Sequence, residues 1–206
     1  LVRDKHGNDE TNIDVNKANS GVSRSTNYTF NLDASGSAKS NIELKLKNSN
    51  MRDAYKSYLQ IVVPKKSTLL GIKVDGKNQL VAEAITDPKV YESKNFKTPK
   101  GLEVEKRLEN DSTIFAFTIT VPSNSSQIIE VSYENGASKN LSSLIDYSLL
   151  LFKQSGIGKY LISANLYYPS SYSPKDLNTK TLNNKIVFEK EVTGNLEFGT
   201  SLVKKS

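Results

Sequence analysis

The chain has 206 residues, of which 28 are basic and 22 acidic, so its formal net charge is +6. It has no cysteine, which excludes thiol catalysis, disulfide bonds and cysteine-based zinc sites. A chain of this length can bury a substantial core without such crosslinks, and its apolar runs are too short for a membrane-spanning helix.

The first twenty residues are polar and show no long period. We expect residues 1–20 to form a flexible lead-in, or the remnant of an upstream region, with at most one short strand at Ile13–Val15. The chain begins at Leu1 instead of Met, which suggests a fragment whose membrane anchor lies upstream. Residues 21–206 are expected to form a single β-sandwich domain.

From Ser25 onward the chain is a series of short segments in which apolar and polar residues alternate, a pattern typical of half-buried strands. The spacing of these segments and the lack of helical periodicity predict an all-β fold, an antiparallel β-sandwich of immunoglobulin-like or related type with about ten strands and little helix. The expected strands are residues 25–32, 40–48, 58–64, 67–74, 79–86, 101–109, 112–122, 126–134, 145–153, 159–169, 184–192 and 195–203.

The sequence predicts the form of three connections between strands. The polar run "DASGSA" at residues 33–38 predicts a hairpin loop, and Asp75-Gly76 predicts a two-residue hairpin because both residues tolerate positive φ. Residues 87–100 contain two prolines and four lysines, and we expect them to form an irregular excursion.

The run "FKQSGIGKY" at residues 152–160 ends in a Gly-Lys pair, as phosphate-binding loops do. Such a loop needs glycine where Lys153 stands and serine or threonine where Tyr160 stands, so a plain connection is the better interpretation. We expect Gln154–Gly158 to be an exposed loop that joins two antiparallel strands. The apolar residues expected to be buried beside it are Leu149, Leu151, Ile162 and Leu166.

The residues required for catalysis are scarce. His6 is the only histidine and lies in the polar lead-in, which argues against a Ser-His-Asp triad. Two carboxylate pairs, Glu103 with Glu105 and Glu189 with Glu191, each share one strand face, an arrangement most often found on solvated surfaces. We therefore predict no enzymatic activity, no metal site and no cofactor.

Tyrosines are concentrated late in the chain. The common interpretation is that most of them lie in the core or at the sheet rim, and the alternative is an exposed platform for a saccharide. The candidate platform residues are Tyr160, Tyr167, Tyr168 and Tyr172.

Four segments together resemble the C-terminal β-rich region of a family of uncharacterised membrane-anchored bacterial surface proteins, a domain-of-unknown-function group. They are "NKANSGVSRSTNYTFNL", "YKSYLQIVVPKKSTL", "FTITVPSNSSQIIEVSYE" and "LLLFKQSGIGKYLISANLYYP". The chain departs from the family at Lys66 and Ser155, where the family has glycine and proline. The resemblance implies an extracytoplasmic β domain that follows a membrane helix and a further domain, and it implies no catalytic residue.

The basic side chains are mostly lysines scattered along the chain, which is typical of a soluble surface and unlike an arginine-rich nucleic-acid reader. We expect a non-enzymatic extracytoplasmic module of a cell-envelope protein at the cell surface, with a structural or interaction role. The alternative is a carbohydrate or anionic wall-polymer binding domain. The expected partner is a cell-wall polymer or another envelope protein, and nucleic acid is not expected.

Overall fold

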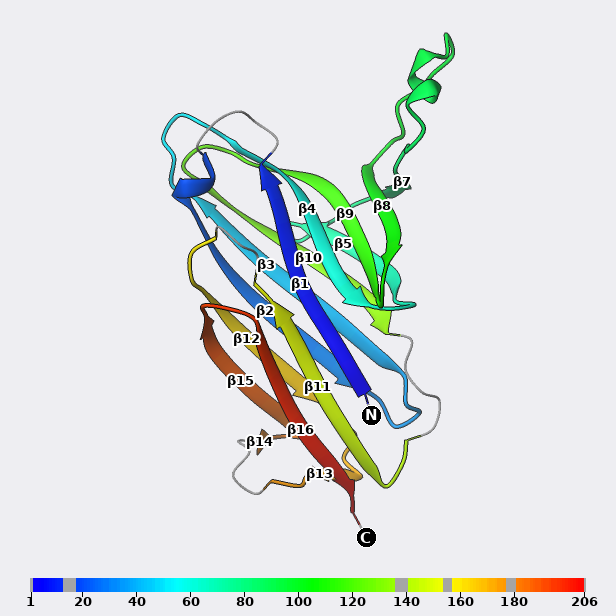
Figure 1. Cartoon of the computed structure of the whole chain (residues 1–206), viewed down its shortest axis with the longest axis vertical. Coiled ribbons are helices and arrows are strands. Elements are labelled where there is room, and N and C mark those ends of the chain that lie inside the picture. The colour runs from blue at the N-terminus through cyan, green and yellow to red at the C-terminus, as the bar shows by residue number, and fades with distance from the viewer. Residues whose placement is uncertain (1, 13–17, 136–140, 154–156, 177–180, 206) are drawn as a thin grey trace.

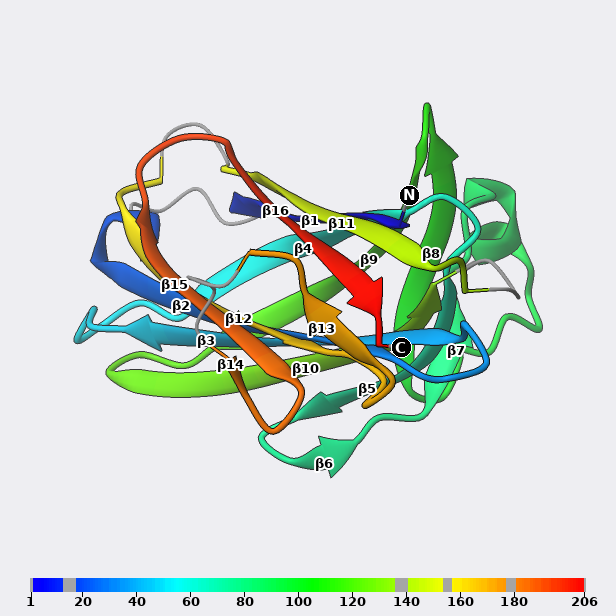
Figure 2. The ribbon, with the colours of Figure 1, turned by 90° about the horizontal axis from the view of Figure 1, so that it is seen from below.

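The computed structural model describes residues 2–12, 18–135, 141–153, 157–176 and 181–205, and up to Asn19 it describes the backbone alone. Figure 2 shows two β-sheets packed face to face as two layers. The first sheet contains, in spatial order, β13 (Tyr172–Pro174), β16 (Leu196–Lys204), β11 (Leu144–Phe152), β1 (Val2–Asn12), β4 (Tyr55–Pro64), β9 (Ser112–Val121), β8 (Leu102–Glu109) and β7 (Val81–Glu83). The all-β sandwich predicted from the sequence is therefore confirmed.

The second sheet has the same number of strands. Its spatial order is β14 (Thr181–Leu182), β15 (Lys185–Val192), β12 (Tyr160–Tyr167), β2 (Val22–Leu32), β3 (Ala38–Asn48), β10 (Ser125–Asn135), β5 (Thr68–Val74) and β6 (Lys77–Asn78). Helix in the described chain is confined to two 3-10 turns, η1 (Ala18–Gly21) and η2 (Pro88–Glu92). The low helix content agrees with the prediction.

The prediction of a purely antiparallel sandwich is wrong in three strand pairs. Three pairs run parallel, namely β1 with β11, β12 with β2, and β7 with β8. The remaining described pairs are antiparallel. Hydrophobic alternation specifies which face of a strand is buried, but the same alternation serves both strand directions. Whether two neighbouring strands run parallel or antiparallel depends on the route that the chain takes between the two sheets.

The prediction of a flexible lead-in is wrong for residues 2–12. Strand β1 lies inside the first sheet, parallel to β11 and antiparallel to β4 (Figure 1). Its polar sequence carries no strand signal, but pairing with β11 along residues 2–7 and with β4 along residues 7–12 provides backbone hydrogen bonds whatever the side chains are. The expected short strand at Ile13–Val15 lies outside the described residues.

The connection between β11 and β12 also differs from the expected loop between antiparallel strands. Strand β11 belongs to the first sheet and β12 to the second, so the connection crosses between layers. The burial prediction holds on both sides of it, since Leu149, Leu151, Ile162 and Leu166 are all buried. Lys159 lies 3.1 Å from Glu191, measured from Nζ to Oε2. Of the loop itself, residues 154–156 lie outside the described residues.

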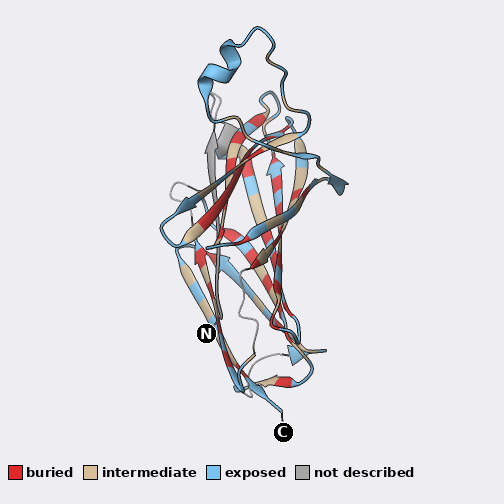
Figure 3. Ribbon diagram, turned by 90° about the vertical axis from the view of Figure 1, so that its right-hand side faces the viewer, coloured by how far each residue is buried: buried red, intermediate tan, exposed pale blue. Residues whose placement is uncertain are grey.

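The two sheets bury one continuous core between them, and its residues are among the red segments of the strands in Figure 3. Its largest members are the aromatic side chains Tyr28, Tyr55, Tyr133, Phe30, Phe115 and Phe117. The rings of Phe30 in β2 and Tyr147 in β11 lie 4.8 Å apart between centroids and so join the two layers. Asn48 is also buried and donates to the carbonyl oxygens of Asp53, Val121 and Pro122, which ties β3 to the end of β9.

The predicted turns are confirmed. Asp75 and Gly76 have φ values of 50° and 74°, and they join β5 to β6. In the loop from β2 to β3, Asp33 accepts hydrogen bonds at Oδ1 from the backbone amides of Ser35 and Ser37. The expected strand at residues 79–86 is shorter in the structure and consists of β7 alone. Residues 84–101 then leave the sandwich as the predicted irregular excursion.

Candidate functional site

The outer face of the first sheet gathers polar side chains where β4, β9 and β8 run side by side. Ala116 of β9 is opposite Gln60 of β4 on one side and Glu105 of β8 on the other. Because the alanine methyl group is small, the longer side chains of the outer strands meet above it. Tyr58 of β4 and Arg107 of β8 lie on the same face, two residues from Gln60 and Glu105 respectively.

Hydrogen bonds link these side chains across β9. The hydroxyl of Tyr58 donates to Oε2 of Glu105, and Nη2 of Arg107 donates to Oε1 of Gln60. The guanidinium of Arg107 also lies 3.5 Å from Oε1 of Glu105 and donates through Nε to Glu109 at 2.7 Å. Both oxygens of Glu105 are therefore engaged, which makes this carboxylate an anchor between strands.

The environment of the network shifts two pKa values. Burial, and then the hydrogen bond and charge of Glu105, raise the pKa of the Tyr58 phenol above its ordinary value. Burial acts to lower the pKa of Arg107, but interactions with Glu109 and then Glu105 raise it overall. Tyr58 therefore remains a hydrogen-bond donor, and Arg107 a cation, throughout the neutral range.

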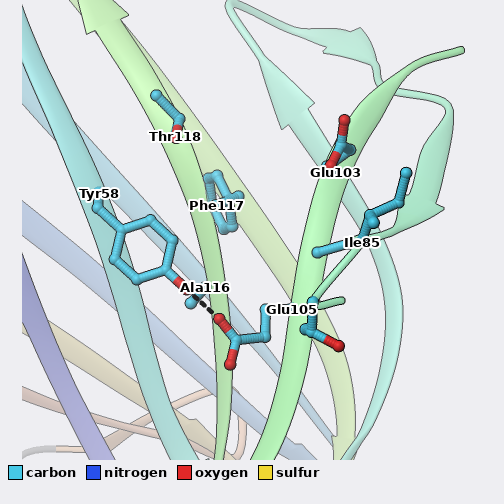
Figure 4. Close-up of a pocket in the computed structure, with 9 residues that line it drawn as sticks. Tyr58, Ile85, Glu103, Glu105, Ala116, Phe117 and Thr118 are labelled. Carbon is cyan, nitrogen blue, oxygen red and sulfur yellow. Dashed lines mark hydrogen bonds between the residues drawn. The ribbon is translucent and has the colours of Figure 1, made fainter. Parts of the chain in front are cut away.

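An open cleft of about 380 Å³ lies beside this network (Figure 4). Its lining comprises Tyr58, Ala84, Ile85, Thr86, Glu103, Glu105, Ala116, Phe117 and Thr118. Figure 4 shows Glu105 reaching toward Tyr58, whereas Glu103 stands farther along β8. Among the described residues Glu103 has no hydrogen-bond or ion-pair partner, so its carboxylate is open to solvent and to a ligand in the cleft.

The residues that line one side of the cleft continue into the excursion, residues 84–101, which extends beyond the ends of the strands (Figures 1 and 3). Its 3-10 turn η2 begins with Pro88, and the side chain of Asp87 caps it by accepting a hydrogen bond from the amide of Lys89 at 2.9 Å. The rings of Tyr91 and Phe96 pack together with centroids 4.8 Å apart. These contacts give the excursion internal structure although none of the residues of η2 is buried.

The base of the excursion depends on a glycine. Gly101 has a φ of 110°, and a β-carbon at this position would lie 2.1 Å from the carbonyl oxygen of Leu80. The same oxygen accepts a hydrogen bond from the amide of Leu102 at 2.8 Å. Glycine lets the C-terminal end of the excursion approach Leu80, the residue before β7, and this contact sets where the chain returns to the sandwich at β8.

The predicted tyrosine platform is absent from the positions proposed for it. Tyr160, Tyr168 and Tyr172 are buried in the core, and burial raises the pKa of Tyr168. Tyr172 also donates to the carbonyl oxygen of Ser142 at 2.8 Å. Tyr167 is exposed, and its ring faces the ammonium of Lys185 at 5.8 Å. The prediction of an exposed platform is therefore wrong for three of the four tyrosines, because their strand positions face inward.

The predicted carboxylate pairs have different surroundings. Glu103 and Glu105 both line the cleft, whereas Glu189 and Glu191 lie on β15, outside the cleft, with Glu191 close to Lys159. His6 lies on β1 opposite Leu151 of β11. The sequence indicated the two cleft carboxylates but not Tyr58, Gln60 and Arg107. A small residue at Ala116, amid the large residues of β9, is the signal that could have found them.

Within the described residues, no three histidine, cysteine, aspartate or glutamate side chains come together in a way that could hold a metal ion. In the same part of the chain, no helix has both the length and the apolar character needed to cross a membrane.

Neither a protein-family model nor a curated protein matches this sequence. Among solved structures, one similar chain is a candidate nutrient-binding protein of Legionella pneumophila, with a TM-score of 0.51 and 10% identity over 97% of this chain and 71% of that one. Another is the leukotriene A4 hydrolase of yeast, solved with bestatin, with a TM-score of 0.50 and 9% identity over 91% of this chain. This chain spans 29% of the length of the hydrolase. At such identities the likeness shows the fold alone.

Proposed function

We propose that this chain is a non-enzymatic extracytoplasmic module of a bacterial cell-envelope protein, and that it acts through contacts made by its excursion. The observation that carries the proposal is the projecting segment, residues 84–101, which extends beyond the sandwich and is coloured mostly as exposed in Figure 3. Its exposed residues include apolar and cationic side chains. Exposed apolar groups beside free charges are typical of surfaces that bind partners. The partner proposed is another envelope component, either a wall polymer or a protein.

The cleft network supports a non-catalytic role. A general base must be available to a substrate proton, yet both oxygens of Glu105 are held by Tyr58 and Arg107. Glu103 is the one open carboxylate that we identify in the cleft, and a carboxylate-based mechanism would require a second. The location in the envelope rests on the sequence resemblance described above and is part of the proposal.

The contact role is tested by shortening the excursion. A variant in which residues 88–99 are replaced by a short Gly-Ser linker keeps both sheets, because neither its Gly101 contact nor any core residue is altered. We expect the wild-type chain to bind purified envelope fragments of the source organism and the shortened variant to lose that binding. The control is Lys45→Ala/Lys47→Ala on the outer face of β3, which alters exposed lysines away from the excursion.

Circular dichroism and urea unfolding of each variant would establish that the sandwich is retained. Equal binding by the shortened and wild-type chains would overturn the assignment of the contact surface. The extracytoplasmic location is tested separately by adding protease to intact cells: cleavage of the native protein is expected, and complete protection would contradict the location.

A second candidate function is carbohydrate binding, and the cleft favours it at a place other than the predicted tyrosines. The ring of Tyr58, the hydroxyls of Thr86 and Thr118, and the carboxylate of Glu103 surround a space whose volume suits a single sugar residue. Titration of isotope-labelled protein with neutral and amino sugars should shift the amide signals of the cleft. Glu103→Gln should weaken binding of an amino sugar, whereas Glu189→Gln should not. Absence of any saturable shift would remove this candidate.

A further inference from the structure

We propose that the tip of the excursion docks onto the headgroup layer of an anionic lipid bilayer. The proposal rests on the proposed function in using the same projecting surface for contact, and it assigns that surface a lipid partner in place of a wall polymer or a protein. The tip is defined here as residues 87–100, which include η2 and the aromatic pair Tyr91 and Phe96. Its chemistry has two parts, a group of free cations and an exposed apolar cluster.

The cationic part is a set of four exposed lysines. Against them the tip has two acidic residues, Asp87 and Glu92, and the side chain of Asp87 caps η2. The lysines are Lys89, Lys94, Lys97 and Lys100. Within the described residues none of these four has an ion-pair partner. The tip therefore presents ammonium groups that are free to contact phosphate.

The apolar part distinguishes a bilayer from a hydrophilic polymer. Tyr91 is 53% exposed and Val90 is 40% exposed, and both belong to η2. The ring of Tyr91 packs on Phe96, so these side chains form one cluster. A wall polymer of sugars and phosphates offers no apolar layer to receive them. The boundary between headgroups and acyl chains does, and aromatic rings with flanking lysines are enriched at that depth.

The position of the tip permits the contact. The excursion is at one end of the long axis and projects past the strands of both sheets (Figure 1), so a flat surface can touch it without meeting the sandwich. Attraction between the lysines and anionic lipid acts within about one Debye length, roughly 8 Å at physiological salt, so the tip contributes most when it touches the membrane.

The test uses the full chain and lipid vesicles. The chain has no tryptophan, so a Tyr91→Trp variant has a single tryptophan fluorophore within the proposed contact. We expect its emission to shift to shorter wavelength with vesicles of phosphatidylcholine and phosphatidylglycerol, and not with phosphatidylcholine alone. The matched control is Leu161→Trp on the outer face of β12, where Leu161 is 62% exposed, and its emission should not shift.

Charge variants measure the lysine contribution by co-sedimentation with the same mixed vesicles. Lys94→Ala/Lys97→Ala should weaken binding about 30-fold, since each lysine near an anionic surface contributes about a factor of five. Lys45→Ala/Lys47→Ala removes the same charge from the sandwich and should change binding less than about threefold. Equal losses in the two double variants would overturn the proposal, since they would indicate a diffuse effect of net charge.

The outcomes separate this proposal from the proposed function. If lipid-free wall fragments bind the wild-type chain through the excursion while anionic vesicles do not, the bilayer proposal fails and the contact function stands. If neither preparation binds, both fail. A shift in the emission of Tyr91→Trp on mixed vesicles, with no shift for Leu161→Trp, supports the bilayer proposal and the role of the excursion as the contact surface.

Discussion

At the scale of single residues, the structure depends on positions that require a small side chain or none. Ala116 is small enough for Glu105 to reach Tyr58 across β9, and Gly101 lets the excursion close on the carbonyl oxygen of Leu80. Ala116 lines the cleft but is not among the groups proposed to contact a sugar, and Gly101 lies outside the cleft lining. Both residues determine where the contacting groups are placed.

Gly101→Ala should destabilise the protein. A β-carbon would overlap the carbonyl oxygen of Leu80, and a φ of 110° is strained for any side chain, so we expect a loss of about 1–3 kcal/mol or more in the free energy of unfolding. Urea unfolding measures the loss. The control is Gly194→Ala, which meets open space and should change the free energy by less than about 0.5 kcal/mol. Equal values for the two variants would contradict the argument.

Stability should fall at high pH in part through two tyrosines. The folded state raises the pKa values of Tyr58 and Tyr168, so it holds protons that the unfolded chain loses, starting near a pH of 10.0. Their contribution to stability is complete below the unfolded pKa and disappears as the pH rises through the folded pKa. Urea midpoints measured across this range should decline less steeply for Tyr58→Phe/Tyr168→Phe than for the wild type. The exposed-hydroxyl control, Tyr91→Phe, should decline as the wild type does, and identical slopes in all three would refute the prediction.

At the scale of elements, β1 and the excursion show that polarity says little about order. Strand β1 is polar in sequence but hydrogen-bonds to β4 and β11, which places it in the interior of a sheet. The excursion is also polar in part. Within the described residues, its backbone hydrogen bond to a sheet strand is the one that the amide of Ala84 donates to the carbonyl oxygen of Val104. The first is therefore part of the scaffold, and the second is the part we propose for contact.

The amides of β1 should exchange slowly with solvent. Residues 2–7 pair with β11 along one edge and residues 7–12 pair with β4 along the other, so exchange of the paired amides requires opening of the first sheet. Hydrogen-deuterium exchange read by mass spectrometry should show strong protection there and weak protection across residues 87–100. Deletion of residues 1–12 should expose unpaired edges on β4 and β11 and cause aggregation. Fast exchange throughout β1 would show that it is not an integral strand.

At the scale of the whole molecule, one core joins the two sheets, so its loss should be felt in both layers. Phe30 of β2 contacts Tyr147 of β11 across the sandwich. Phe30→Ala should cost about 3–5 kcal/mol, because the residue is fully buried and its removal leaves a cavity. Exchange protection should fall in β2 and β11 alike, whereas Phe152→Ala, at a side chain that is 36% exposed, should alter neither much. Loss of protection confined to one sheet would argue against a shared core.

The sequence by itself determined the strand content, the inward face of most strands, the turns at residues 33–38 and 75–76, and the irregular excursion. These features depend on local period and turn chemistry, which neighbouring residues carry. The tertiary structure decided the rest: the insertion of polar β1, the parallel pairs, the burial of Tyr160, Tyr168 and Tyr172, and the meeting of Tyr58 with Glu105. Those depend on which distant strands become neighbours, and a period of two cannot encode a partner.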